Sequence, residues 1–552
     1  MSTQDNNNTT SKSGGLFSDK AFNDGPNDRA VATDSKTETV NNSGSAQQQL
    51  ALATEPETIP SDSSKKNMSD YLQQARKTTV SEGEPLKLAV VGHTNTGKTS
   101  LLRTLLRDMY FGEVKNEAAT TRHVERALIK DSQTGENLVA LFDTPGLEDA
   151  SGLMDWLEDN TASRRDGIER LQQFLASDIA KSDAQGGGLN DALNDYSQEA
   201  KVIRQLLSSD MAIYVIDARE PVLGKYKDEL AILSWSAIPV MPVFNFTDSQ
   251  DANISEWQTM LARRNLHIST RFDSVAFEFE DEMTLWQNLA TMLTHPETLN
   301  QLIMRRREDW IQLYEQATII IAHFLIDVAA YVREIDEDDD PMPVLKEMQE
   351  AVRQSERAMQ EKLLNLYKFY DNTAVVTPLE LSEYQQDPFD PELLKSYGLR
   401  TTSGAAAGAL LGLGIDAAAL GTTLGLGAAI GGLAGGILSN TGTIADKLAG
   451  VKRLFIDPAT LTLLATRSLD LLASLRHRGH AANADTPIAE LQETSTPPWN
   501  PNKLPSELKK ARGKPQWSSL TSGKSSLAEE LRADAAWSLS DKLKRSRHEE
   551  KD

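Results

Sequence analysis

The sequence predicts a doubly wound α/β domain with a mostly parallel sheet, followed by an α-helical domain that includes a Gly-rich apolar hairpin. Three observations support this fold class. Short β-branched runs alternate with longer helical stretches between residues 86 and 279, a glycine-containing loop joins the first run to a helix, and the pattern becomes helical after residue 290. Apolar runs flanked by helices are typical of a parallel sheet covered on both faces.

Six runs are the expected strands of this sheet. Between the third and the fourth, residues 150–208 are charged and helical in pattern, so they form an expected helical insertion. Glycines at residues 186–188 interrupt this insertion. The expected strands are residues 86–92, 125–131, 137–143, 211–217, 238–246 and 273–279.

The composition changes along the chain and predicts four regions. Residues 1–80 and 481–552 are polar and are expected to be disordered, because they cannot bury enough apolar surface to offset the entropy of ordering. The α/β domain is expected at residues 81–290, and the helical domain at residues 291–480. Long helices are expected within residues 302–334, 343–370 and 458–476.

Charge and cysteine content exclude several kinds of protein. The chain carries 57 Lys and Arg against 80 Asp and Glu, a formal net charge of −23, which disfavours nucleic acid as a partner. It has no cysteine, so disulfides, zinc–thiolate sites and a Cys nucleophile are excluded. The N-terminus lacks a basic start followed by an apolar run, so a cytoplasmic protein is expected.

The pattern Gly92-x-x-x-x-Gly97-Lys98-Thr99 follows the first expected strand and precedes a helix. This is the setting in which backbone N–H groups and a helix N-terminus bind phosphates. Lys98 is expected to neutralise the β- and γ-phosphates, and Thr99 to ligate Mg²⁺. The residues expected to bind the nucleotide phosphates are His93, Thr94, Asn95, Thr96, Gly97, Lys98, Thr99, Ser100 and Gly146.

Two further segments complete the expected magnesium site. Asp143 ends the third strand and is followed by Thr-Pro-Gly, so Asp143 is a candidate Mg²⁺ ligand and the amide of Gly146 can contact the γ-phosphate. Thr121 lies in a polar loop between the two motifs and can close on Mg²⁺ when a γ-phosphate is present. Together these patterns predict a P-loop NTPase domain with Mg²⁺ as cofactor, in which Lys98 and Thr121 are the candidate catalytic residues.

The segments GHTNTGKT, TTRH and DTPG, in this order and spacing, resemble the Era and TrmE branch of the translation-factor-related GTPases. The resemblance implies a G domain that hydrolyses GTP and covers residues 81–290. It also implies that Leu147 replaces the water-orienting glutamine of Ras-like proteins, so another group must position the attacking water. Asn95 stands where potassium-activated members carry a K⁺-coordinating asparagine, which makes K⁺ a second candidate cofactor.

Base selection is expected at Asn245-Phe246-Thr247-Asp248, after the fifth strand. Asp248 can accept hydrogen bonds from guanine N1 and N2, and Asn245 can tie neighbouring loops together. Phe246 replaces the lysine of the usual Asn-Lys-x-Asp motif, and an aromatic ring can stack there. If this segment is only a strand-ending turn, adenine binding or weak base selectivity remains open.

Residues 403–438 consist almost entirely of Gly, Ala, Leu and Ile, with glycines at four-residue spacing. Such spacing allows close helix packing in a bilayer, where one span needs about 20 apolar residues. The segment is too long for one straight span and slightly short for two, so a re-entrant or short hairpin is expected. Arg400 precedes it and Lys447 and Lys452 follow it, which favours cytoplasmic ends. Asp416 opposes deep insertion. The alternative is a Gly/Ala-rich helical hairpin packed within the C-terminal domain.

The C-terminal half resembles an uncharacterised domain that follows a GTPase domain in a family of proteobacterial proteins. The stretch from Asp217 to Leu230 carries part of this resemblance and makes Arg219, Glu220 and Lys225 candidates for a function. The start of a surface helix, with Pro221 near its N-terminus, explains these residues equally well.

Three functions remain open from the sequence. The first is a GTP-hydrolysing switch associated with the cytoplasmic membrane, either peripherally or integrally, through a lipid or a membrane protein. The second is a soluble GTPase that assists ribosome or RNA assembly. The third is a nucleotide-binding scaffold with negligible turnover.

Overall fold

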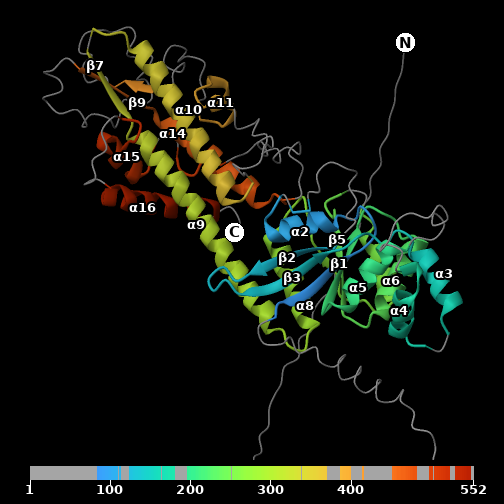
Figure 1. Cartoon of the computed structure of the whole chain (residues 1–552). Coiled ribbons are helices and arrows are strands. Elements are labelled where there is room, and N and C mark those ends of the chain that lie inside the picture. The colour runs from blue at the N-terminus through green and yellow to red at the C-terminus, as the bar shows by residue number, and fades with distance from the viewer. Residues whose placement is uncertain are drawn as a thin grey trace, which may run out of the picture. The chain divides into compact units, whose positions relative to one another are not determined.

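The computed structural model describes thirteen stretches of the chain, and Figure 1 shows their elements. The expectation of disorder at residues 1–80 lies outside the described residues. The stretches are residues 84–109, 111–112, 124–162, 165–180, 196–249, 252–336, 338–369, 386–399, 413–415, 451–480, 496–500, 503–521 and 529–548.

A six-stranded sheet forms the centre of the first domain, with strand order β2-β3-β1-β4-β5-β6. All neighbouring strands are parallel except β2 and β3, which pair in antiparallel fashion. This arrangement confirms the predicted α/β fold class. The strands are β1 (Leu86–Val91), β2 (Glu125–Lys130), β3 (Asn137–Asp143), β4 (Met211–Asp217), β5 (Val240–Asn245) and β6 (Thr270–Arg271).

The sixth predicted strand, residues 273–279, is wrong. The strand that pairs with β5 is Thr270–Arg271, and the chain turns directly after it. The carboxylate of Asp273 accepts the backbone N–H groups of Val275 and Ala276 at 2.9 and 3.0 Å. These amides are thus satisfied by a local side chain rather than by a neighbouring strand.

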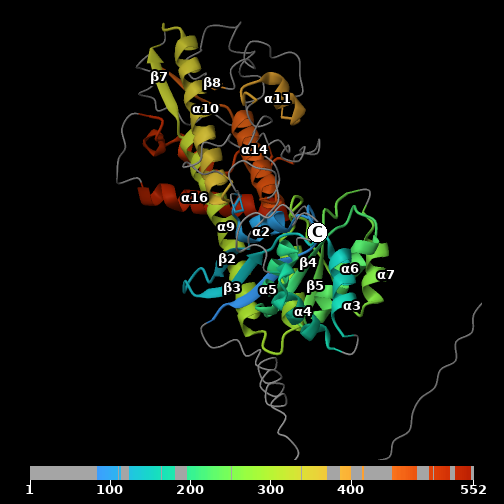
Figure 2. The ribbon, with the colours of Figure 1, turned by 45° about the vertical axis from the view of Figure 1, so that its right-hand side comes forward.

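The central strands are buried on both faces, because alternate side chains point into two different cores. Ala89 and Tyr214 belong to one core with α3 to α7, and Leu88 and Ile213 belong to the other with α2, α8 and the start of α9. Figure 2 shows α3, α6 and α7 together beside the sheet. The helices are α2 (Lys98–Leu106), α3 (Ala150–Asn160), α4 (Gly167–Ala176), α5 (Ser197–Leu207), α6 (Gly224–Trp235), α7 (Ile254–Ala262), α8 (Phe279–Thr291) and α9 (Glu297–Ala329).

The expected insertion at residues 150–208 contains α3, α4 and α5, and its glycine break at 186–188 lies outside the described residues. The boundary expected at residue 290 is followed by one continuous helix. Leu299 and Leu302 of α9 pack in the core of the α/β domain, whereas Ala317 and later residues pack in the second core. Trp310 contacts both cores, so α9 joins the two domains without a linker (Figure 1).

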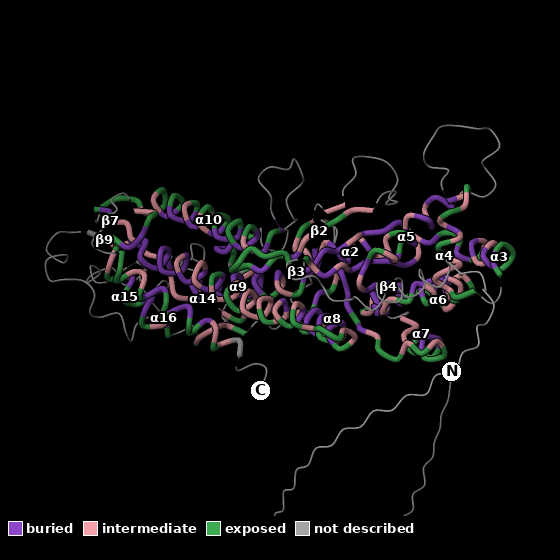
Figure 3. The backbone as a smooth tube through the Cα atoms, turned by 60° about the horizontal axis from the view of Figure 1, so that its bottom comes forward, coloured by how far each residue is buried: buried purple, intermediate pink, exposed green. Residues whose placement is uncertain are grey.

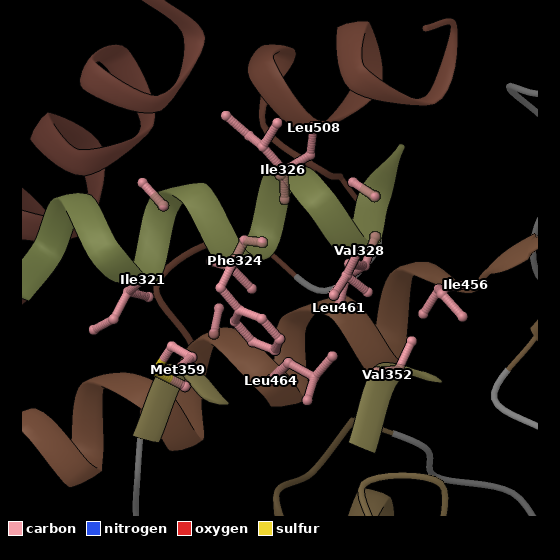
Figure 4. Close-up of a cluster of buried hydrophobic side chains, with 14 of the residues drawn as sticks. Ile321, Phe324, Ile326, Val328, Val352, Met359, Ile456, Leu461, Leu464 and Leu508 are labelled. Carbon is pink, nitrogen blue, oxygen red and sulfur yellow. The ribbon is translucent and has the colours of Figure 1, made fainter. Parts of the chain in front are cut away.

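The second domain is built around α9, which contacts α10, α14, α15 and α16. Phe324 of α9 packs among Met359 and Leu464 in a core that Figure 4 shows. Asp residues cap α10, α11 and α14 in front of a proline, which suits the first helical turn. The helices are α10 (Pro341–Leu366), α11 (Pro391–Ser396) and α14 (Pro458–Arg476), and the antiparallel sheet β7-β9-β8 consists of β7 (Val332–Asp336), β8 (Leu413–Ile415) and β9 (Val451–Ile456).

The prediction of a disordered tail at residues 481–552 is wrong for residues 503–521 and 529–548. They form α15 (Ser506–Arg512), the short η4 (Pro515–Trp517) and α16 (Glu529–His548). Leu508, Trp517 and Leu539 are buried in the second core. Figure 3 labels α15 and α16 and colours their residues by burial. The local composition is polar, and the apolar partner surface is supplied by α9 from far away in the sequence.

The Gly-rich segment 403–438 lies outside the described residues except for Leu413–Ile415. These three residues form β8 and pair with β9, so they are extended rather than part of a helical hairpin. Within the described stretches, no helix is both long enough and apolar enough to cross a membrane.

Candidate nucleotide-binding site

The loop from Gly92 to Gly97 connects the carboxyl end of β1 to α2 and lies at the edge where β4 and β5 also end. Gly97 has a φ of 87°, and a Cβ there would overlap the side-chain nitrogen of Asn245. Glycine is therefore required both by the left-handed backbone and by the close approach. Asn95 is exposed at the tip of the loop with a φ of 66°, a conformation that asparagine tolerates.

Lys98 is the first residue of α2, so it stands at the helix N-terminus, where the backbone N–H groups carry a partial positive charge. Its Nζ donates to the carbonyl oxygens of Gly92 and His93 at 3.2 and 2.7 Å. Burial lowers the pKa of Lys98 to about 8, against the opposing effect of nearby carboxylates that include Asp143. This buried positive charge suits a phosphate group. Ser100 follows in the same first turn and is half-buried.

Thr99 and Asp143 meet at the start of α2 and the end of β3. Thr99 Oγ1 donates to Asp143 Oδ2 at 2.5 Å, and Asp143 Oδ1 is buried without a hydrogen-bond partner. Burial raises the pKa of Asp143 to about 6. A hydroxyl and a carboxylate with a buried oxygen to satisfy fit Mg²⁺, which prefers oxygen ligands. Thr121, the third predicted ligand, lies outside the described residues.

The segment after Asp143 lies against the phosphate loop. A Cβ on Gly146 would overlap the hydroxyl oxygen of Thr94, so only glycine allows this approach. Thr94 Oγ1 in turn donates to Glu148 Oε1 at 3.1 Å. Leu147 is fully buried in the core that contains α3 to α7. A leucine side chain has no hydrogen-bonding group, and this one is buried, so Leu147 cannot orient a water molecule.

His93 is among the residues predicted to bind phosphate, and its ring contacts α6. Nε2 lies 2.8 Å from Lys225 Nζ, and Nδ1 lies 2.8 Å from Glu229 Oε1 and 2.9 Å from the carbonyl of Leu147. An ammonium group only donates, so Nε2 accepts and Nδ1 carries the proton. Glu229 is fully buried and also accepts the hydroxyl of Tyr214 at 2.7 Å. Lys225 was a candidate for a function from the sequence, but its contact with His93 and the part played by Glu229 were not expected.

Asn245 links three loops at the end of β5. Its Nδ2 donates to the carbonyl of Thr96 at 3.1 Å, and its Oδ1 accepts the N–H groups of Phe246 and Ser274, each at 3.0 Å. Asn245 is completely buried. The linking role expected for Asn245 is thus what the geometry provides. The loop of Ser274 was missed as part of the site because its residues were assigned to a strand.

Phe246 lies beside the phosphate loop, and Asp248 follows two residues later. The ring of Phe246 lies 3.1 Å from the position that a Cβ of Gly97 would take, and the guanidinium of Arg219 lies 4.0 Å from its centroid. Arg219 is held by two hydrogen bonds to the carboxylate of Asp217. Asp248 is exposed, and its backbone N–H donates to Asp273 at 3.4 Å. An aromatic face and an exposed carboxylate are suitable for contact with a purine base.

Replacing Asn245 by Ala is expected to lower the free energy of unfolding by about 2–3 kcal/mol, because a buried side chain loses three hydrogen bonds together. The affinity for GDP is expected to fall as well, since the phosphate loop loses its tie to the Ser274 loop. Melting curves with and without GDP measure both effects. The matched control is Asn160→Ala, which removes an exposed asparagine with one hydrogen bond to the carbonyl of Trp156. Equal melting temperatures for the two variants would contradict the linking role.

Comparison with known proteins agrees with this geometry. Residues 87–246 match the family described as "50S ribosome-binding GTPase", and residues 258–539 match the family described as "Domain of unknown function (DUF3482)". The first domain is therefore a P-loop GTPase domain, and the predicted pairing of a G domain with a separate helical domain is confirmed.

Two individual proteins are similar to this chain. The tRNA modification GTPase MnmE of a Nitratiruptor species is 31% identical over 148 residues, which are 26% of this chain and 29% of that protein. The chain thus matches less than a third of that relative. A crystal structure of Aquifex aeolicus Era, a variant bound to GDP and AlF4⁻, has 13% sequence identity and a TM-score of 0.26, and the match covers 51% of this chain and 89% of that chain.

Proposed function

This chain belongs to the family described as "Domain of unknown function (DUF3482)", and we propose that it binds GTP, hydrolyses it to GDP with Mg²⁺ and acts as a nucleotide-dependent switch. One observation carries the proposal: Lys98 and the N-terminus of α2 lie beside the Thr99–Asp143 pair, with Asn245 bonded to the same loop. A cation for the phosphates, oxygen ligands for a metal and a base-side contact thus share one edge of the sheet.

The residues have distinct roles in this proposal. Lys98 transfers its hydrogen bonds from the carbonyls of Gly92 and His93 to the β- and γ-phosphates. Thr99 and Asp143 hold Mg²⁺, which neutralises charge that develops on the transferred phosphoryl group. Thr121 is proposed to close over this site when a γ-phosphate is present, and Gly146 presents its amide from the opposite side.

The attacking water needs a partner other than residue 147, since Leu147 is buried. We propose that K⁺ bound at Asn95, on the exposed tip of the phosphate loop, supplies positive charge to the transition state. Phe246 and Asp248 are proposed to contact guanine, with Asp248 accepting from N1 and N2.

Single-turnover hydrolysis tests this function directly. We expect GTP to be hydrolysed about tenfold faster or more in K⁺ than in Na⁺, because one well-placed charge changes such rates by at least that factor. ATP is the matched control for the base and is expected to be hydrolysed more slowly than GTP. Equal rates in the two salts would contradict the potassium site but not the GTPase function. Tight GTP binding without turnover in either salt would instead favour the scaffold function.

We further propose that the protein associates with the cytoplasmic membrane through residues 403–438, as a peripheral or integral protein. The support is the composition of this segment, whose apolar length exceeds that of one span and falls slightly short of two, and the cationic residues after it. Lipid or a membrane protein is the proposed partner.

Fractionation of the full-length protein with GDP or with a non-hydrolysable GTP analogue tests the membrane proposal. We expect a large share of the protein to float with lipid vesicles, in a proportion that differs between the two nucleotides. A variant without residues 403–438 is expected to stay in the soluble fraction, and Lys98→Ala is expected to float equally with both nucleotides. If the full-length protein is absent from the floating fraction both with GDP and with the GTP analogue, the membrane proposal is contradicted.

A ribosome-linked function is the second candidate, because the family matched by residues 87–246 is described as ribosome-binding. The net charge of −23 opposes RNA contact unless a local basic patch overrides it. Co-sedimentation with ribosomes in the GTP-analogue state separates this candidate from the membrane-associated switch.

A further inference from the structure

A cavity of about 160 Å³ lies where the two domains meet around the middle of α9. Its walls come from the end of α2, the loop after β6, α9, and the ends of α10 and α14. One lining residue from each wall, in the same order, is Arg107, Phe277, Trp310, Tyr367 and His480. A space of this size holds a small molecule, since engineered cavities of about 150 Å³ bind benzene.

The cavity is strongly basic in a protein that is acidic as a whole. Five cationic side chains are among the described residues that line it, whereas Asp309 is the acidic residue among them. Glu282 lies behind the wall, 2.8 Å from Arg107 and 3.5 Å from Arg306, and compensates part of this charge. The five cationic residues are Arg107, Arg306, Lys368, Arg476 and Arg478.

Aromatic rings also contact two of these cations. Arg107 lies 4.3 Å from the centroid of Phe277 and 5.3 Å from that of Trp310, and Arg476 lies 5.1 Å from the centroid of Trp310. Trp310 itself is stacked on Phe279 at 4.7 Å. Cation–π contacts hold a guanidinium group without neutralising it. The five cationic side chains outnumber the two nearby carboxylates, Asp309 and Glu282, and the surrounding rings reduce the screening of this charge by water.

His480 adds a second and independent observation. It is 4% exposed, and its Nε2 donates to the carbonyl of Tyr367 at 3.0 Å. Nδ1 is then an acceptor, and it is buried without a hydrogen-bond partner. Burial, aided by Arg107 and other cations, lowers the pKa of His480 to about 3, so the ring is neutral near pH 7. A ligand that complements this wall carries negative charge and also an O–H group.

We propose that this cavity binds a small phosphate-bearing anion, either inorganic phosphate or a phosphate monoester, at a site separate from the nucleotide site. Guanidinium groups bind phosphate oxygens through paired hydrogen bonds. Hydrogen phosphate also carries an O–H donor for His480, which a simple carboxylate lacks. Because Arg107 ends α2 and Phe277 follows the Ser274 loop, the bound anion contacts both the GTPase domain and the helical domain. The proposal does not depend on GTP hydrolysis.

Titration calorimetry of the full-length protein, saturated with GDP and Mg²⁺, tests the site. Inorganic phosphate and glycerol phosphate are titrated separately at constant ionic strength, and acetate serves as the anion without an O–H donor. Arg476→Gln and the exposed Lys368→Asn are each expected to raise the Kd for phosphate about tenfold or more. Arg357→Gln removes an exposed arginine of α10 outside the cavity and is the matched control with the same change of charge.

Lys98→Ala separates this site from the phosphate loop and from the proposed function. Phosphate binding that persists in Lys98→Ala and Arg357→Gln but is weakened by Arg476→Gln and Lys368→Asn supports the cavity site. The tighter of the two phosphate compounds then identifies the preferred form. Loss of binding in Lys98→Ala with no effect of Arg476→Gln would overturn the proposal, as would equal binding of acetate or the absence of binding at millimolar concentrations.

Discussion

Replacing Lys98 by Ala is expected to weaken GDP and GTP binding by at least about 100-fold. The ammonium group is buried at the N-terminus of α2 and bonds only to the carbonyls of Gly92 and His93 in the described contacts, so it is available for phosphates. Removing a buried, hydrogen-bonded charge from a binding site costs about 3 kcal/mol or more, which corresponds to that factor. Fluorescent GDP binding measures the change.

Folding of the Lys98→Ala variant is not expected to suffer. The pKa of Lys98 is lowered to about 8 by burial, from 10.5. The folded protein thus binds this proton less tightly than the unfolded chain, so the charged lysine destabilises the fold below about pH 8, and the penalty disappears as the pH rises toward 10.5. Melting without nucleotide is therefore expected to be unchanged or improved at pH 7.

The matched control is Lys87→Ala on β1, whose side chain is 38% exposed and pairs with Glu84. It removes the same charge from the same strand–loop–helix unit and is expected to leave GDP binding within twofold of the original. Retained nucleotide binding in Lys98→Ala would contradict the assignment of the phosphate loop.

Replacing Asp143 by Asn is expected to reduce Mg²⁺-dependent GTP hydrolysis by about 100-fold or more. Asn keeps the shape and can still accept from Thr99, but it removes the negative charge that attracts the metal. Charge stabilisation by a catalytic metal contributes several kcal/mol. Hydrolysis is measured across a Mg²⁺ titration, and GDP binding in EDTA is expected to remain, because Lys98 is untouched.

The empty Asp143→Asn protein is expected to melt at a higher temperature near pH 7. Burial raises the pKa of Asp143 to about 6, from 3.8. The folded state therefore holds this proton more tightly than the unfolded chain, and stability is lost as the pH rises between about 4 and 6. The neutral amide removes this penalty.

Asp210→Asn is the control for this change. Asp210 precedes β4 at the opposite end of the sheet, where it accepts the backbone N–H of Lys87 at 2.8 Å. Its replacement is expected to leave the Mg²⁺ dependence unchanged. Normal hydrolysis in Asp143→Asn at ordinary Mg²⁺ concentrations would remove Asp143 from the metal site.

The α/β fold and the phosphate loop were predictable because their signals are local. A glycine at position 97 is needed by its own backbone angle, and Lys98 and Thr99 follow it directly on the first turn of α2. The apolar runs of the central strands likewise indicate burial on both faces without knowledge of their partners. The pairing of Thr99 with Asp143 follows from two strands that end at one edge of a parallel sheet.

Only the tertiary structure decided the remaining features, because they join residues far apart in the sequence. The ring of His93 contacts α6, since Lys225 and Glu229 are brought to it by packing. The polar tail around Trp517 is ordered because α9 supplies an apolar surface that the tail's own composition does not reveal. The basic cavity around Trp310 collects side chains from both domains. The sequence by itself thus determined the class of fold and the phosphate-binding loop, and long-range packing determined which side chains surround them.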